Sequence, residues 1–208
     1  MGKSHEGHSG RVSLLRRVLF LGPHTCPWWF AYTFDNPLRR FIHDPVAILG
    51  AFVKPGNTVV DIGCGLGYFS LALAELVGPA GRVVALDVQP QMIERARHRA
   101  ERQGLANRIE FQVCAPDKLG VTCLVDFALA FWVVHEVGDP ESLLSEVRSF
   151  LQPHGHLLIA EPKGHVSADR FAASTKLASS VGYAVSEGPP VQFSRSAICS
   201  PAPENIQL

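Results

Sequence analysis

The sequence predicts an α/β fold, a doubly wound and mostly parallel sheet of seven strands with helices on both faces. Short β-branched or apolar runs alternate with stretches of helical apolar spacing from residue 58 onward. A glycine-rich turn joins the first of these strands to the helix after it. The 208 residues, 47% of them hydrophobic and 18% charged, suffice for one globular domain with an arm. Such alternation is typical of βαβ units.

Each predicted element has its own local signal. Apolar runs predict five strands, over residues 58–62, 82–88, 109–113, 125–133 and 156–160. Helical spacing and caps predict helices over 46–52, 68–77, 90–103, 140–151 and 168–182. Two further strand-like runs, 183–187 and 193–199, flank Gly188-Pro189-Pro190 and predict a hairpin. The sheet should therefore end in an antiparallel C-terminal strand pair.

Four regions follow from this pattern. Residues 1–22 are expected to form a flexible tail with a short helix over 11–21, and residues 23–57 an aromatic arm followed by the N-terminal helix. The α/β domain is expected over 58–200 and a C-terminal tail over 201–208.

Composition excludes several classes of protein. Lys and Arg number 19, as do Asp and Glu, so the electrostatic field that attracts nucleic acid or anionic membrane is missing. Five scattered cysteines without a C-x-x-C pair encode neither a disulfide framework nor a zinc ribbon, and no metal site is expected. The apolar runs are too short to span a bilayer. A cytoplasmic protein without a membrane partner is the resulting expectation.

The most informative stretch is the turn at residues 59–70, which reads VVDIGCGLGYFS. Gly63, Gly65 and Gly67 allow tight backbone angles and close approach of a ligand to the start of the next helix. About twenty residues later the second strand ends in Asp87, which suits both hydroxyls of a ribose. Tyr68 stands where a dinucleotide fingerprint has its third glycine. An NAD-dependent oxidoreductase is therefore disfavoured.

With these motifs the chain resembles the class I S-adenosylmethionine-dependent methyltransferases, a superfamily with a Rossmann-like fold, and most closely their type 11 small-molecule group. The resemblance covers most of residues 53–199 and is carried by four motifs, at 59–67, 84–87, 126–137 and 151–162. It implies that S-adenosyl-L-methionine is the cofactor. It also implies where this cofactor binds: the methionine part against Asp61, Gly63, Gly65 and Gly67, the ribose on Asp87 and the adenine beside Val88.

One position departs from the family pattern. Many members have an acid after the third strand that binds the adenine amino group, and Ala115 aligns there. Backbone groups of Cys114 and Ala115 are the expected replacement, and Asp117 could replace the acid only with a differently shaped loop.

The acceptor side is expected at the carboxyl ends of strands four and five, which nominates His135 and Glu161. His135 suits a general base for an oxygen or nitrogen acceptor, with acceptor positioning as its alternative role. In the arm, Trp28, Trp29 and Tyr32 are candidate substrate residues that would cover the cleft, and the alternative is that they cover a hydrophobic face of the sheet.

The sequence thus predicts methyl transfer from S-adenosylmethionine to a small-molecule acceptor by in-line displacement. A catalytically silent module that binds the same cofactor, or an assembly partner of this fold, is the alternative. A nucleic-acid methyltransferase is disfavoured because strand four lacks the Asn/Asp-Pro-Pro-Tyr element. A protein or nucleic-acid acceptor is the less favoured alternative.

Overall fold

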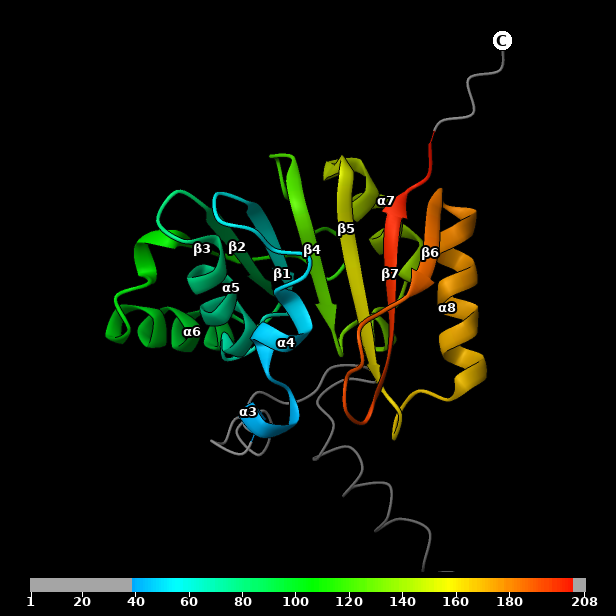
Figure 1. Ribbon diagram of the computed structural model, residues 1–208, viewed down its shortest axis with the longest axis horizontal. Helices are drawn as coiled ribbons and strands as arrows, with labels where there is room; N and C mark the ends of the chain where they lie inside the picture. Colours follow the sequence, from blue (N-terminus) through cyan, green and yellow to red (C-terminus); the bar gives the residue numbers. More distant parts are fainter. Residues whose placement is uncertain (1–38, 204–208) are drawn as a thin grey trace, which may run out of the picture.

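The computed structural model describes residues 39–203, and these form one seven-stranded sheet with the order β3-β2-β1-β4-β5-β7-β6 (Figure 1). The strands are β1 (Thr58–Ile62), β2 (Arg82–Asp87), β3 (Ile109–Val113), β4 (Val125–Phe131), β5 (Leu151–Pro162), β6 (Tyr183–Glu187) and β7 (Ser194–Pro201). All pairings among β1 to β5 are parallel, whereas β7 is antiparallel to both β5 and β6. The predicted fold class and its antiparallel C-terminal pair are confirmed.

Helices cover both faces of this sheet. They are α3 (Arg39–Ile42), α4 (Pro45–Leu49), α5 (Tyr68–Val77), α6 (Pro90–Arg102), α7 (Pro140–Phe150) and α8 (Ala168–Ser180), with 3-10 turns η1 (Ala106–Arg108) and η2 (Val134–Glu136). Neighbouring strand residues such as Val59 and Val60 are fully buried in opposite cores, since strand side chains alternate between faces. One core packs against α4, α5 and α6, and the other against α7 and α8.

Helix caps form as the sequence predicts. The carboxylate of Asp44 accepts a hydrogen bond of 2.9 Å from the backbone N–H of Val46 and so caps α4. Asp139 and Ser167 cap α7 and α8 in the same way, through Ser142 and Arg170.

Several strand boundaries differ from the prediction, and β7 spans Ser194–Pro201 instead of residues 193–199. β4 ends at Phe131 instead of residue 133, because Trp132 has a positive φ of 61° that an extended strand does not allow. β5 begins at Leu151 instead of residue 156, because Leu151 is buried and pairs with Val125 across an irregularity in the β4–β5 register. The apolar run of strand five alone therefore underestimates its length.

Parts of the sequence prediction lie outside the described residues, namely the tail over 1–22, the aromatic arm with Trp28, Trp29 and Tyr32, and the last residues of the chain. Within residues 39–203, no helix is long and apolar enough to cross a membrane. The same part of the chain contains no cluster of His, Cys, Asp or Glu side chains that could hold a metal ion.

The parallel strands β1 to β5 end at a common carboxyl edge, where α/β sheets bind their ligands. In Figure 1 this is the lower edge, to which the arrowheads of β4 and β5 point and near which α3 lies. Because β7 runs the other way, its first residue, Ser194, lies at this edge and pairs with Pro162. The residues predicted to act on donor and acceptor therefore meet at one edge.

Candidate active site

The glycine loop after β1 has left-handed backbone at Gly63, Gly65 and Gly67, with φ of 69°, 54° and 79°. A Cβ atom at Gly63 would lie 2.8 Å from the side chain of Val133, and one at Gly67 would lie 3.0 Å from Ala96. A Cβ atom at Gly65 would have no protein atom within 4 Å. Gly63 and Gly67 thus permit close packing, whereas Gly65 borders open space that a ligand can enter.

Asp87, at the end of β2, is tied to this loop. Its carboxylate is buried and accepts hydrogen bonds of 2.9 Å from the backbone N–H groups of Gly65 and Gln89, one on each oxygen. Burial raises the pKa of Asp87, and these hydrogen bonds oppose the rise. Each oxygen keeps a lone pair for a hydroxyl group. Val88, which follows, is 38% exposed and offers apolar surface next to the acid.

Asp61, in β1, is a second buried acid at the same edge. Only 2% of its surface is exposed, and the Ser70 hydroxyl donates a hydrogen bond of 2.5 Å to its carboxylate. Burial, and to a lesser degree the charge of Asp87, raises the pKa of Asp61 to about 6, against the effect of the Ser70 hydrogen bond. Among the described residues, neither carboxylate forms an ion pair. A cationic ligand would therefore stabilise both ionised acids.

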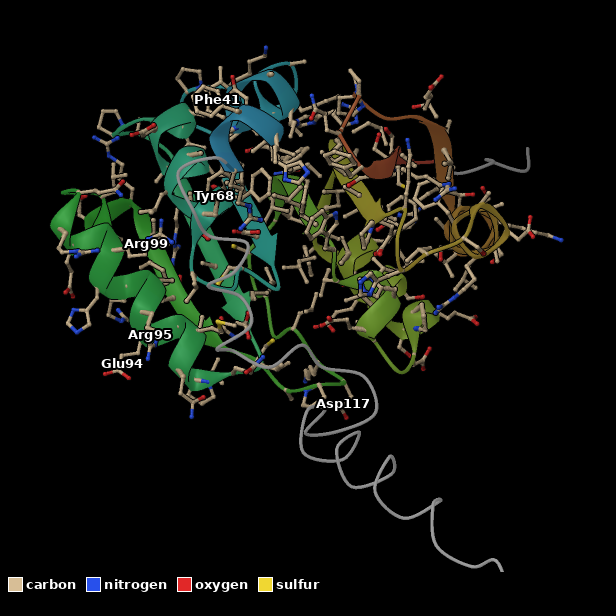
Figure 2. The ribbon with its side chains drawn as sticks, turned by 90° about the horizontal axis from the view of Figure 1, so that it is seen from below. Phe41, Tyr68, Glu94, Arg95, Arg99 and Asp117 are labelled. Carbon is tan, nitrogen blue, oxygen red and sulfur yellow. The ribbon has the colours of Figure 1, made fainter. Side chains whose placement is uncertain are left out.

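Tyr68 connects the start of α5 to the segment around α3. Its hydroxyl donates a hydrogen bond of 2.7 Å to the backbone oxygen of His43, and the Arg39 guanidinium lies 4.3 Å from the centre of its ring. Figure 2, which looks onto the carboxyl edge, shows Tyr68 on the same side of the molecule as Phe41 of α3, with Asp117 at the opposite side of the view. Tyr68, which stands where a dinucleotide fingerprint has its third glycine, is thus bound to the His43 backbone.

The segment after β3 uses its amides within the protein. The Cys114 N–H donates to the Asp87 backbone oxygen at 3.0 Å, and the Ala115 N–H donates to the Lys118 oxygen at 3.1 Å. Asp117 lies in the exposed turn between Ala115 and Lys118. A contact of Cys114 or Ala115 with adenine therefore has to use a carbonyl oxygen or a side chain, not the amides.

His135 and Glu161, predicted separately, form a pair. His135 lies in η2 after β4, and Glu161 lies near the end of β5 with 1% of its surface exposed. One carboxylate oxygen of Glu161 forms a short hydrogen bond with Nδ1 of His135, and the other accepts the His135 backbone N–H at 3.3 Å. An ionised carboxylate only accepts hydrogen bonds, so the proton of the neutral ring resides on Nδ1. Nε2 has no hydrogen-bond partner in the described part of the chain.

Charge around the pair sets the basicity of His135. Burial is the largest influence and lowers its pKa, but the hydrogen bond and charge of Glu161, together with the charge of Glu136, outweigh it. The net result is a raised pKa. The ring of His165, which is exposed, lies 6.2 Å from that of His135.

The glycine loop after β1 and the His135–Glu161 pair are connected in space through the residues that follow β4. The left-handed Trp132 turns the backbone at the end of β4, and its N–H still donates to the Ala160 oxygen at 2.8 Å. Val133 then packs against Gly63, and His135 follows two residues later. Sequence reasoning missed both Trp132 and Ser70, because neither residue type signals its backbone angle or its partner.

Comparison with known proteins gives the family. The family model described as "Methyltransferase domain" matches residues 53–188. The chain belongs to this methyltransferase family. Among solved structures, an S-adenosylmethionine-dependent methyltransferase from Aquifex aeolicus has the same fold, with a TM-score of 0.75 and 24% identity over 84% of this chain and 98% of that one. The predicted superfamily, its class I fold, the enzyme class and the cofactor are confirmed, and the type 11 small-molecule group stays a prediction.

Curated relatives of this methyltransferase match it over a shorter stretch. A ubiquinone/menaquinone biosynthesis C-methyltransferase from Ectopseudomonas mendocina is 32% identical over 110 residues, which are 52% of this chain and 43% of the relative. A ribosomal protein L11 methyltransferase from Vibrio campbellii is 31% identical over 105 residues, 50% of this chain and 33% of the relative. The matches thus span less than half the length of these relatives.

The carboxyl edge of the methyltransferase suits its cofactor. S-adenosylmethionine carries an ammonium and a sulfonium but no phosphate, so buried acids serve it better than a phosphate-binding lysine. Asp61 and Asp87 supply the acids, and the open space at Gly65 lies beside Asp87.

Proposed function

We propose that this methyltransferase transfers the methyl group of S-adenosylmethionine to a hydroxyl oxygen of a small molecule, with His135 as the general base. The observation that carries the proposal is the His135–Glu161 pair at the carboxyl edge. Glu161 orients the ring and stabilises its protonated form, while Nε2 is left to accept a proton from the acceptor. A pair of this kind has little use in attack by a neutral, proton-free atom.

On the donor side, the proposal follows the resemblance residue by residue. The methionine part lies against Asp61, Gly63, Gly65 and Gly67, the ribose on Asp87, and the adenine beside Val88, Cys114 and Ala115. When bound, S-adenosylmethionine supplies an electrophilic methyl group next to a positively charged sulfur. The contribution of the chain is alignment of the acceptor oxygen, removal of its proton and exclusion of water.

Two features favour a small acceptor. The chain has no net charge, which gives little attraction for nucleic acid, and the curated relatives include methyltransferases of quinone biosynthesis. In this proposal Trp28, Trp29 and Tyr32 contribute to the acceptor site, and the protein acts in the cytoplasm. Another relative is a ribosomal protein L11 methyltransferase, so a protein acceptor is the competing possibility that the experiment has to test.

The test is release of S-adenosylhomocysteine with a panel of small hydroxylated compounds, ribosomal protein and RNA as acceptors. We expect turnover with the hydroxylated compounds and a loss of about 10²–10⁴-fold in His135→Ala, typical of a general base. Glu161→Gln should lower the kinetic pKa seen in the pH profile of kcat/KM, because the charge that raises the pKa of His135 is gone.

The matched control is His165→Ala, which removes a neighbouring exposed imidazole and should leave turnover unchanged. Calorimetry should show unchanged binding of S-adenosylhomocysteine to all three variants. Turnover with ribosomal protein or RNA alone would contradict a small acceptor, and full turnover by His135→Ala would remove this residue from the mechanism.

A further inference from the structure

Two non-glycine residues in the described part of the chain have positive φ, and both are aromatic: Trp132 at 61° and Phe193 at 57°. Bulky side chains rarely adopt this region, and such strain persists only where the surrounding structure enforces it. Strained residues of this kind gather at binding sites. The pair therefore calls for an explanation beyond the fold.

The two strained residues are neighbours. Nε1 of Trp132 donates a hydrogen bond of 2.9 Å to the hydroxyl of Ser194, the residue after Phe193. The backbone oxygen of Phe193 accepts the Lys163 N–H at 2.8 Å, and the oxygen of Gln192 bonds to the His43 ring at 3.0 Å. The backbone is thus held by hydrogen bonds before, at and after Phe193.

Burial does not explain Phe193. The ring of Trp132 packs edge-on against His43, with 5.1 Å between ring centroids, and against Phe131 at 5.3 Å. Phe193 is 69% exposed and makes no ring contact with any other described residue. Glycine or asparagine would adopt the same backbone at lower cost and would expose less apolar surface. The exposed phenyl ring is therefore explained by the binding of another group against it.

The position of Phe193 indicates what covers it. Ser194 pairs with Pro162, and the next pair in the register is Arg195 with Glu161. Phe193 therefore lies at the carboxyl edge, directly before β7, which pairs with the strand that carries the acid partner of His135. This is the edge at which the donor loop also lies.

We propose that Phe193 is a stacking surface for a flat aromatic ring of the acceptor, and that the acceptor is a hydroxyl-bearing aromatic compound. This inference rests on the proposed function and names its substrate class. Aromatic rings stack on one another with a preference that aliphatic rings lack. The base gives an independent reason. A phenolic hydroxyl has a pKa of about 10, which is much closer to the pKa of a histidine than the pKa of an aliphatic alcohol is. His135 can therefore deprotonate a phenol during attack.

The balance of the reaction agrees with this substrate class. The phenolic oxygen forms the new bond to the methyl carbon while the bond between that carbon and sulfur breaks, with its electron pair going to sulfur. The phenolic proton passes to Nε2 of His135, and S-adenosylhomocysteine leaves as a neutral thioether. No oxidant or further reactant is needed.

The experiment uses 2-naphthol as a flat probe and decahydro-2-naphthol as its non-aromatic counterpart with the same carbon skeleton. Binding of each to the 208-residue chain loaded with S-adenosylhomocysteine is measured by calorimetry, and methyl transfer by S-adenosylhomocysteine release. We expect 2-naphthol to bind about three- to ten-fold more tightly, and Phe193→Ala to remove this preference while Phe193→Tyr keeps it.

Two further variants separate a binding role from a structural one. Phe193→Gly should lose the preference as Phe193→Ala does, yet melt about 2–4 °C higher than Phe193→Ala because glycine relieves the strain. Leu124→Ala removes an exposed apolar side chain just before β4, at the opposite edge of the sheet, and should change neither property.

Equal binding of the two probes, or an unaltered preference in Phe193→Ala, would overturn the aromatic acceptor. The proposed function fails by a different result, namely full turnover by His135→Ala, so the two failures are distinguishable.

Discussion

Replacing Asp61 by asparagine should make the unliganded protein more stable at neutral pH. The carboxylate is buried and its pKa rises from 3.8 to about 6. Each pH unit of this difference corresponds to about 1.4 kcal/mol, so ionised Asp61 lowers the free energy of unfolding by about 3 kcal/mol at pH 7. Asparagine keeps the shape and can still accept the Ser70 hydrogen bond but carries no charge. Asp61→Asn should therefore recover most of this amount.

The sign of the pH dependence follows from proton binding. Between the unfolded pKa of 3.8 and the folded pKa of about 6, the folded state binds more protons than the unfolded state, so this carboxylate lowers stability increasingly as pH rises through that window. Below it, the acid is protonated in both states and the penalty disappears. The difference in stability between Asp61→Asn and the wild type should be small near the bottom of the window and reach its full size above pH 6.

Urea unfolding of both proteins between about pH 4 and 7.5 measures this difference, because most other titrating groups contribute equally to both proteins. Ser70→Ala is the control, because it removes the hydrogen bond that stabilises the ionised acid and should lower stability at pH 7. The reasoning would be refuted if Asp61→Asn were less stable than the wild type at pH 7, or if the difference did not depend on pH.

The same charge should favour the donor. A bound ammonium or sulfonium stabilises ionised Asp61, so binding of S-adenosylmethionine should weaken as pH falls below 6, by up to about ten-fold per pH unit. Asp61→Asn should bind more weakly at pH 7 and lose this dependence on pH.

Three further predictions concern the donor loop and its partners. Gly63→Ala should lower the free energy of unfolding by about 3 kcal/mol or more, because it adds a clash with Val133 to a strained φ. Gly65→Ala should lower it by only about 1 kcal/mol in urea unfolding but should weaken S-adenosylhomocysteine binding. Equal losses of stability in the two variants would contradict the open space at Gly65. Asp87→Ala should weaken binding in calorimetry by at least about 100-fold, because it loses the ribose contacts and frees the Gly65 amide; unaltered affinity would refute the ribose assignment. Tyr68→Phe should lose about 1 kcal/mol of stability with unchanged binding, and a large loss of affinity would show that Tyr68 contacts the cofactor.

Where local sequence signals are strong, the fold could be predicted to the residue. β1, α5 and β6 have the predicted bounds, because each is a β-branched or periodic run followed directly by glycine, and β3 has the predicted bounds as well. The end of β4 and the start of β5 could not be predicted, since a positive φ at Trp132 and the pairing of Leu151 with Val125 depend on tertiary contacts. At these two strand ends, tertiary contacts determine the backbone conformation, not the local sequence preference.

The candidate site shows the same division. The sequence nominates His135 and Glu161 as residues at strand ends, but their pairing depends on the neighbouring positions of β4 and β5 in the sheet. The hydrogen bond from Ser70 to Asp61, and the use of the Cys114 and Ala115 amides within the protein, likewise arise only after folding. The sequence predicts Phe193 as the first residue of a strand over 193–199, but its positive φ keeps it out of β7, and no sequence pattern encodes this backbone angle or its exposure.

The central claim is that the acids and glycines of the carboxyl edge hold S-adenosylmethionine. Calorimetry of the wild type and of Asp87→Ala with S-adenosylmethionine, S-adenosylhomocysteine and NAD tests it without knowledge of the acceptor. We expect the wild type to bind both sulfur nucleosides but not NAD, and Asp87→Ala to lose both. Binding of NAD, or sulfur nucleosides that bind Asp87→Ala as well as the wild type, would contradict the claim.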